Sequence, residues 1–124
     1  MSGGDNVSFD FQEKIPIYIQ VVDIIKKDIS KDILKSGDKL PSVRDMATRF
    51  KVNPNTIQRA YLELEKEAIT YTQRGMGTYI SENTQVIEEV KNSTIKSMAL
   101  MVIKQFKELD MDKGEAIKII EENW

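Results

Sequence analysis

The chain has 124 residues with 18 basic and 20 acidic side chains, a formal net charge of −2, and neither cysteine nor histidine. This length predicts one domain, or a small domain with an appendage. The two missing residue types exclude disulfides, cysteine or histidine metal sites and most nucleophile–base pairs of enzymes. No apolar run reaches membrane length and no signal-peptide pattern opens the chain, so we expect a cytoplasmic protein with no metal and no other cofactor.

The N-terminal part predicts an unstructured segment followed by a scaffold helix. Residues 1–8 hold a Ser-Gly-Gly-Asp-Asn run, which is typical of disorder. From Pro16 onward, apolar residues keep helical spacing until Gly37, which we expect to end this helix. They are Tyr18, Val22, Ile25, Ile29 and Ile33. We interpret Tyr18 as a core residue of this stripe, the alternative being a functional phenol.

The next stretch predicts a short, capped helix. Ser42 lies three residues ahead of Asp45, which is the Ser-x-x-acid pattern of a capping box. Apolar residues then recur at helical spacing as far as Phe50. We therefore expect a helix from about Ser42 to Phe50, followed by a tight corner at Lys51 and Val52.

A second helix is expected directly after the corner. Asn53 can cap it, and Pro54 suits its first position, where the missing N–H costs nothing. An apolar stripe at helical spacing must face a core, and it consists of Ile57, Ala60, Tyr61, Leu64 and Ala68. The other face presents Asn55, Thr56, Gln58 and Arg59. This is the layout of a helix-turn-helix that reads DNA with its second helix, although a polar face that meets only water remains the alternative.

A β-hairpin is expected after the second helix. Residues 69–72 alternate apolar and polar side chains, residues 73–77 form a turn with two glycines, and residues 78–80 are again β-prone. Arg74 lies at the tip beside Gly75, whose lack of a side chain lets the backbone approach a phosphate or a minor groove. After a helix-turn-helix such a wing is a second DNA contact, and a merely solvated arginine is the alternative.

These motifs, in this order, resemble the N-terminal winged-helix domain of the GntR family of bacterial transcription regulators. The matching text comprises Ile15-Pro16-Ile17-Tyr18-Ile19-Gln20, Gly37-Asp38-Lys39-Leu40-Pro41-Ser42-Val43-Arg44, Val52-Asn53-Pro54-Asn55-Thr56, Arg59-Ala60-Tyr61, Leu64-Glu65 and Gly75-Met76-Gly77-Thr78. The corner motif and the short remainder of the chain point to the YtrA-like subfamily. One departure is Ala68, where the family usually has glycine. Alanine fits that turn only if φ stays negative or strain is accepted.

The resemblance implies which residues touch DNA. The family's contacts fall on Arg44, Asn53, Asn55, Thr56, Gln58, Arg74 and Gly75, and we add Ser42 and Arg59 to the predicted DNA-binding residues. Gln58 can pair bidentately with adenine and is our first choice for base readout. Asn53 and Thr56 can instead serve only as caps or phosphate anchors.

Charge is distributed unevenly around this motif. Residues 39–62 hold five basic side chains and one acidic, whereas three of the next five residues are glutamates. The near-neutral total predicts weak non-specific DNA binding at physiological salt, and therefore a dimer that doubles the phosphate contacts. Within the motif, Arg44 can also be merely solvated, and Arg59 can pair with Glu63, four residues on.

Residues 83–124 predict two further helices. Asn83-Thr84 can cap a long helix with an apolar excess, and Asp112 with Glu115 can cap a short one. We expect this region to form the dimer contact through Val90, Met98, Met101, Val102, Phe106, Ile117, Ile120 and Trp124. A ligand box is an alternative for the methionines, but a core or dimer seam suits their helical spacing better.

Removal of residues 84–124 would test whether they form the dimer contact. A chain cut after Asn83 is expected to stay folded and become monomeric, whereas a persistent dimer would move the interface to the first helix or to the arm of Phe9 and Phe11. About 40 residues are too few to enclose a drug-sized effector pocket. A small-molecule effector, if there is one, is therefore expected between subunits or near residues 78–84.

We predict a mainly α fold with a small β-hairpin. It consists of a winged helix-turn-helix over residues 9–82 and a two-helix dimerisation hairpin over residues 83–124. The predicted function is a homodimeric repressor of a transporter-linked operon that binds a pseudo-palindromic double-stranded DNA operator. The resemblance implies the link, because relatives of this short type are often encoded beside transporter operons. A winged helix that docks proteins without specific DNA binding is the alternative. An enzyme is disfavoured because the chain has no histidine, no cysteine and no glycine-rich phosphate loop.

Overall fold

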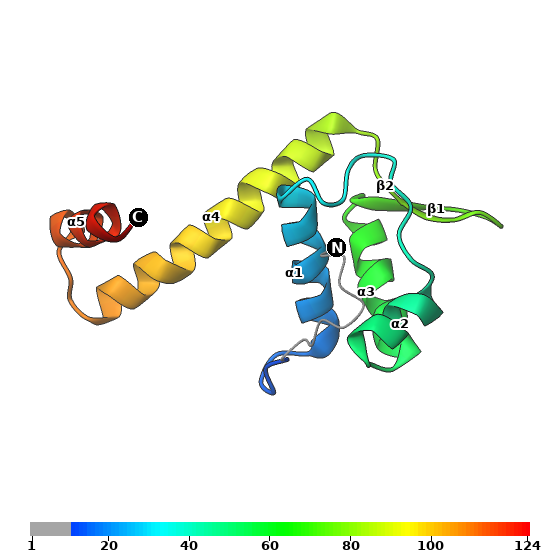
Figure 1. Cartoon of the computed structure of the whole chain (residues 1–124), viewed down its shortest axis with the longest axis horizontal. Coiled ribbons are helices and arrows are strands. Elements are labelled where there is room, and N and C mark those ends of the chain that lie inside the picture. The colour runs from blue at the N-terminus through cyan, green and yellow to red at the C-terminus, as the bar shows by residue number, and fades with distance from the viewer. Residues whose placement is uncertain (1–10) are drawn as a thin grey trace. The chain divides into compact units, whose positions relative to one another are not determined.

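The computed structural model describes residues 11–124, and over this part of the chain it has five helices and one two-stranded antiparallel hairpin (Figure 1). The elements are α1 (Ile17–Ser30), α2 (Val43–Phe50), α3 (Pro54–Lys66), β1 (Thr70–Gln73), β2 (Gly77–Ile80), α4 (Thr84–Glu108) and α5 (Lys113–Asn123). This confirms the mainly helical fold with a small hairpin. Residues 1–8, predicted to be disordered, and Phe9 lie outside the described residues.

The chain forms two compact units whose boundary falls inside α4. The first unit extends to Asn92 and the second comprises Ser93–Trp124. We expected the boundary near residue 82, but the first turns of α4 carry Ile87 and Val90 into the core of the first unit. Val90 is only 6% exposed, so it is not available for the dimer contact predicted from the sequence.

The core of the first unit is built between α1 and α3, which lie side by side (Figure 1). Both helices bury one face at helical spacing, and the fully buried residues of the two faces are Val21, Ile25, Ile29, Ile57, Ala60 and Leu64. The other elements complete this core with Leu34, Leu40, Met46, Ala47, Phe50, Ile69, Ile80, Ile87 and Val90. Burial of α3 along one side leaves its opposite side in solvent.

The first helix ends earlier than the sequence pattern predicts. α1 stops at Ser30, well before Gly37, because Asp32 takes a left-handed conformation with φ of +59°. The N–H groups of Asp32 and Ile33 then donate to carbonyls of the last helical turn, at 3.1 and 2.9 Å, which is a Schellman closure. Ile33 therefore leaves the helix and is 39% exposed, so it does not belong to the predicted apolar stripe.

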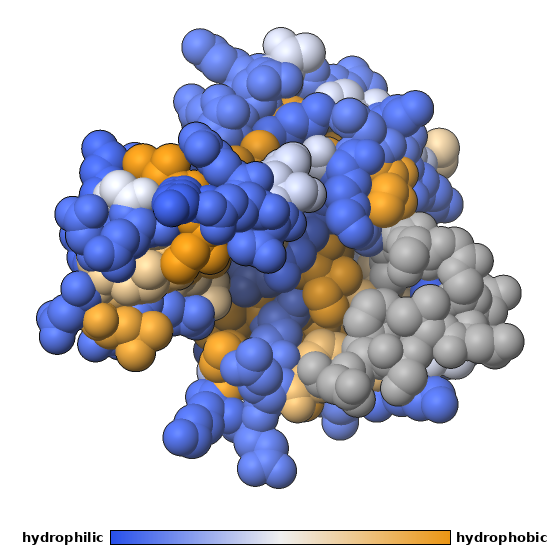
Figure 2. All heavy atoms as spheres, turned by 60° about the vertical axis from the view of Figure 1, so that its left-hand side comes forward, coloured by the Kyte–Doolittle hydropathy of each residue, from blue (hydrophilic) through white to orange (hydrophobic). Residues whose placement is uncertain are grey.

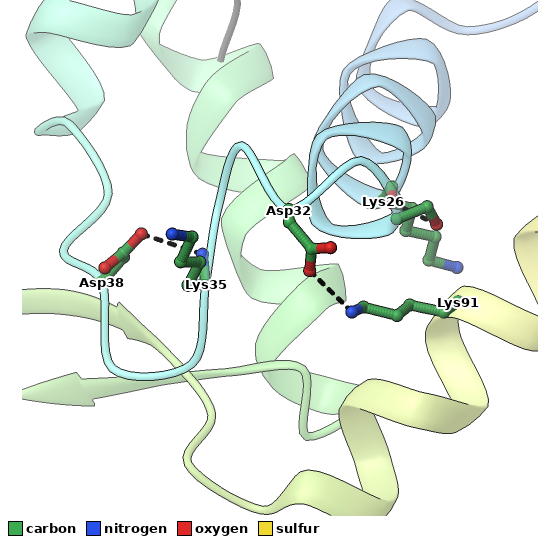
Figure 3. Close-up of polar contacts among 6 residues, drawn as sticks. Lys26, Asp32, Lys35, Asp38 and Lys91 are labelled. Carbon is green, nitrogen blue, oxygen red and sulfur yellow. Dashed lines mark hydrogen bonds and ion pairs between the residues drawn. The ribbon is translucent and has the colours of Figure 1, made fainter.

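Gly37 has a different role, because it begins a short segment that hydrogen-bonds to β2 of the hairpin. The Ile80 carbonyl accepts the Gly37 N–H at 2.9 Å, and the Ile80 N–H donates to the Asp38 carbonyl at 2.8 Å. Gly37 has a φ of +83°, a conformation that favours glycine, and this turn directs the chain along β2. The side chain of Asp38 tightens the same turn by accepting the Lys35 N–H at 2.8 Å (Figure 3). This pairing ties the base of the wing to the segment that leads into α2.

α1, α2, α3 and α4 all end in the same Schellman closure, and in none of them is the left-handed residue a glycine. The four residues are Asp32, Lys51, Ala68 and Asp110, with φ between 56° and 60°. A side chain in this conformation costs roughly 1–2 kcal/mol relative to glycine. The structure therefore shows Ala68 in the strained form. Ala68 is also exposed and lies beyond α3, so it is not part of the predicted stripe.

An ion pair joins the first turns of α4 to the loop after α1. The Lys91 ammonium donates to the Asp32 carboxylate at 2.7 Å (Figure 3). This hydrogen bond, together with the positive charge of Lys91, holds the pKa of Asp32 below its ordinary value of 3.8. The same bond raises the pKa of Lys91 above 10.5. Because both groups are accessible to solvent, salt screens the pair.

Ala68→Gly is expected to stabilise the protein. Relief of roughly 1–2 kcal/mol of strain exceeds the roughly 0.4–1 kcal/mol by which glycine favours the unfolded chain, so the free energy of unfolding should rise by about 0.5–1 kcal/mol. Urea unfolding is the measurement. The matched control, Ala47→Gly inside α2, should instead lower stability by roughly 1 kcal/mol or more. A lower midpoint for Ala68→Gly would contradict the left-handed conformation.

Asp32→Asn tests the ion pair through its pH dependence. Asparagine tolerates the left-handed conformation, so the change removes the charge and leaves the backbone unstrained. A lowered folded-state pKa stabilises the protein above the unfolded value, and this stabilisation is lost as the pH falls through the folded pKa. The variant should therefore be less stable than the wild type near neutral pH, and the difference should shrink as the pH drops below 3.8. A difference that does not change with pH would show that the ion pair contributes nothing.

Candidate nucleic-acid interface

The predicted cap holds the start of α2. Ser42 Oγ accepts the Asp45 N–H at 3.1 Å, so the hydroxyl of Ser42 serves as the N-cap. Arg44 follows in the first turn, where its side chain is exposed. Within residues 11–124 no carboxylate forms an ion pair with Arg44. The guanidinium of Arg44 is therefore available to an anion.

α3 presents the polar face that the sequence predicts. Asn53 Oδ1 accepts the Asn55 N–H at 2.8 Å, and Pro54 occupies the first helical position. This cap uses one of the two polar atoms of the Asn53 side chain. Asn55 and Gln58 are exposed and Thr56 is half-buried. Their polar groups lie opposite the buried stripe, so the core fixes which side of α3 faces outward.

A buried tyrosine locks α3 against the segment before α2. Tyr61 Oη donates to the Pro41 carbonyl at 2.7 Å, and the side chain is only 6% exposed. Burial raises the pKa of Tyr61, so the phenol stays neutral and keeps its proton for this bond. The bond therefore fixes the start of α2 relative to α3.

Arg59 packs against a tyrosine of α1. Its guanidinium carbon lies 4.0 Å from the centroid of the Tyr18 ring, and Nη2 lies 3.5 Å from the phenol oxygen. Arg59 forms no ion pair with Glu63, which was the other possibility. Tyr18 is half-buried at the edge of the core, so it is a packing residue on one side and a partner of Arg59 on the other.

The wing is a regular hairpin with its predicted tip. β1 pairs with β2 in antiparallel register, and the rings of Tyr71 and Tyr79 stack across the pair with centroids 5.6 Å apart. Arg74 and Gly75 lie in the exposed turn. Gly75 has a φ of +77°, and a Cβ there would meet no atom within 4 Å. The positive φ therefore explains why a glycine stands at position 75 in the free protein, since a side chain there would meet no neighbouring atom.

Lys39 is a cation that the predicted site did not include. Its side chain runs under the base of the wing, where a Cβ on Gly77 would lie 2.7 Å from the Lys39 Cε. Lys39 is exposed and pairs with no carboxylate among the described residues. The second glycine of the Gly-Met-Gly turn was the sequence signal for this close approach, but its partner is far away in the chain.

Two surface hollows are lined in part by predicted DNA-binding residues. One has a volume of about 620 Å³ and lies between the start of α2 and the base of the wing, with Lys39, Ser42, Arg49 and Gly77 among its lining residues. The other has a volume of about 370 Å³ and is lined by Ile17, Tyr18, Asn55, Thr56 and Arg59. The other predicted residues line neither hollow, namely Arg44, Asn53, Gln58, Arg74 and Gly75. In the described part of the chain, no cluster of acidic side chains is arranged to hold a metal ion.

The second unit exposes most of its apolar side chains. Asp112 caps α5 by accepting the Gly114 N–H at 3.1 Å. Of the predicted dimer residues, Met98, Met101, Val102, Ile117, Ile120 and Trp124 are exposed, and Phe106 is half-buried. Figure 2 shows such apolar side chains, in orange, at the surface. None of the described helices is long and apolar enough to cross a membrane.

Comparison with known proteins places this geometry in a family. The model of the bacterial regulatory proteins of the gntR family matches residues 17–80, from α1 to the end of the wing. The chain is 44% identical over 108 residues to the uncharacterized HTH-type transcriptional regulator YhcF of Bacillus subtilis, covering 87% of this chain and 89% of YhcF. It is 43% identical over 106 residues to the HTH-type transcriptional repressor YtrA of the same organism, covering 86% of this chain and 77% of YtrA.

Solved structures show the same relationship. A GntR family transcriptional regulator from Listeria monocytogenes superposes with a TM-score of 0.84 at 40% identity, covering 90% of this chain and 98% of that one. The structure of AraR(DBD) in complex with an operator superposes with a TM-score of 0.53 at 25% identity, covering 60% of this chain and 92% of that one. The first match covers more of the chain than the winged part alone.

Proposed function

Because the chain belongs to the GntR family, whose members are transcription regulators and not enzymes, we propose that it is a homodimeric repressor that binds a pseudo-palindromic operator in the bacterial cytoplasm. The observation that carries this proposal is the outward face of α3. It combines an amide, a hydroxyl and a guanidinium from Gln58, Thr56 and Arg59 on a helix that the core holds in place. These groups match the donors and acceptors of base edges and phosphates in a major groove.

Cations and polar groups around α3 would position the duplex. Arg44 at the start of α2 and Arg74 at the wing tip are exposed and unpaired within the described residues, which suits phosphate contacts. Lys39 at the base of the wing adds a third such cation. Ser42 and Asn53 cap the starts of α2 and α3, where the remaining polar groups, and the exposed side chain of Asn55, can meet phosphate oxygens.

A relative supports the proposed repressor role, and the exposed apolar side chains of the second unit support the proposed dimer. The relative YtrA is a transcriptional repressor, and a regulator that occupies its operator can block transcription without an additional domain. One subunit offers a single recognition helix, so a two-fold dimer would read two half-sites about one helical turn apart. The exposed apolar side chains of the second unit would supply the contact between subunits. We also propose that the operator belongs to a transporter-linked operon.

Selection from a pool of random duplexes tests the function directly. The wild-type protein should enrich one two-fold symmetric sequence, and footprinting should protect both half-sites. Gel-shift competition with random DNA separates this result from the alternative of a protein-docking module, which would show no sequence preference. Protection of a single half-site by a monomer would contradict the proposed binding mode.

Gln58 and Arg74 are expected to have different roles. Gln58→Ala should cost roughly 1–3 kcal/mol and relax the preference at one base pair, because it removes a bidentate base contact. Arg74→Ala should weaken all sequences alike and flatten the salt dependence by about one unit, because it removes a phosphate contact. Binding to duplex variants over a range of salt concentrations measures both effects. Gln85→Ala, an exposed amide on α4, is the control and should change neither.

Dimerisation is expected to depend on the second unit. Because Ile87 and Val90 belong to the core, the informative cut lies after Asn92 and not after Asn83. A chain ending at Asn92 should keep the winged fold, sediment as a monomer and bind a full operator little better than one half-site. Loss of the linked second half-site should reduce affinity by roughly 10²-fold or more.

A full-length variant separates dimer loss from truncation damage. Met101→Glu places a charge on an exposed apolar position of α4, and Gln105→Glu adds the same charge to an exposed polar position of that helix. Met101→Glu should dissociate the dimer at micromolar concentration, and Gln105→Glu should not. A dimer that survives both Met101→Glu and the cut after Asn92 would place the interface in the first unit.

A further inference from the structure

We propose that Tyr18 is a positioning residue for DNA readout, because its ring holds the Arg59 guanidinium in place beside the first turn of α3. This inference rests on the proposed function and adds a residue of α1 to the DNA-reading surface. The sequence pattern alone assigned Tyr18 to the core. The geometry assigns it a second role, at the point where α1 and α3 meet the surface.

The contact is a cation–π interaction. The Arg59 guanidinium carbon lies 4.0 Å from the ring centroid of Tyr18. Nη2 donates to the Tyr18 phenol oxygen at 3.5 Å, and no other hydrogen bond of the guanidinium is formed within residues 11–124, so its other N–H groups are not used by the protein. Arg59 therefore keeps the groups that recognise a guanine edge or a phosphate while its side chain is held by the protein.

Both residues of this contact lie on helices that the core holds together. Tyr18 lies in the first turn of α1 and Arg59 lies in the middle of α3, and these two helices share the fully buried core faces. A long arginine side chain otherwise loses much rotamer freedom when it binds DNA. Because Tyr18 already restricts that freedom in the unbound protein, less is lost on binding.

The surroundings of the guanidinium contain further polar groups of α3. Tyr18 and Arg59 line a hollow of about 370 Å³ together with Ile17, Asn55 and Thr56. The amide and the hydroxyl in this hollow come from the first turn of α3, the part of a recognition helix that faces base edges. Without the ring of Tyr18, Arg59 can turn toward Glu63, four residues on, and its charge would be neutralised there.

A double-mutant cycle in the full-length protein tests this inference. The probes are a duplex selected by the wild type from a random pool and a random-sequence duplex of the same length. Tyr18→Leu should weaken binding to the selected duplex roughly three- to fivefold through loss of the cation–π contact, and Arg59→Met should weaken it at least as much. Tyr18→Leu combined with Arg59→Met should bind no more weakly than Arg59→Met alone. Tyr18→Phe keeps the ring and should bind like the wild type.

The two DNA probes distinguish what Arg59 contacts. If it reads a base, both single variants should lose preference for the same base pair of the selected duplex. If it contacts a phosphate, both should weaken the selected and the random duplex alike and flatten the salt dependence by about one unit. Either pattern supports the inference, provided that Tyr18→Leu and Arg59→Met share it.

A purely structural role for Tyr18 would give a different result. In that case Tyr18→Leu would weaken binding equally with and without Arg59→Met, and this outcome overturns the inference, as does unchanged binding by Tyr18→Leu. Phe11→Leu removes another ring at the core edge, packed against Phe50 at 6.3 Å, and should lower thermal stability without coupling to Arg59→Met. A wild type that selects no duplex rejects the proposed function itself, and the inference with it.

Discussion

The packing of α1 against α3 is the constraint on which the rest of the molecule depends. α3 buries Ile57, Ala60 and Leu64 completely, and α1 supplies the apolar face that covers them. Since a helix that buries one side must expose the other, this single contact determines which residues of α3 can meet DNA. It also brings Tyr18 to Arg59 and so sets the direction of a guanidinium on the reading surface.

The connections between elements are tight because the helices end in strained but fully bonded turns. Asp32, Lys51, Ala68 and Asp110 all take the left-handed conformation without being glycine, and the following N–H groups still find carbonyls of the last turn. At Ala68 the strain is small beside the burial of Ile69, which comes next and is only 2% exposed. The angle of the wing is therefore set by packing, and the local backbone preference yields to it.

α4 has two different environments along one continuous helix. Its first turns bury Ile87 and Val90 and carry Lys91 to the Asp32 carboxylate. Beyond Asn92 the same helix exposes apolar side chains such as Met101, which is 65% exposed. A surface of this kind is costly in water unless a second molecule covers it, which is the physical basis for proposing a dimer through the second unit.

The sequence by itself determined the parts of the protein that depend on neighbouring residues. The caps at Ser42 and Asn53, the corner at Lys51 and the turn of the wing all follow from contacts a few residues apart, and all of them are present. The polar face of α3 was likewise predictable, because helical spacing sorts side chains onto faces.

Only the tertiary structure decided the features that join distant segments. Tyr18 meets Arg59 across 41 positions of the chain. Lys39 lies under Gly77, and Val90 enters the core and not an interface. The end of α1 at Ser30 was also not predictable from the spacing, because the apolar periodicity continues beyond the residue at which the helix ends. Spacing along a chain records which side chains share a face, but it does not record which other face covers them.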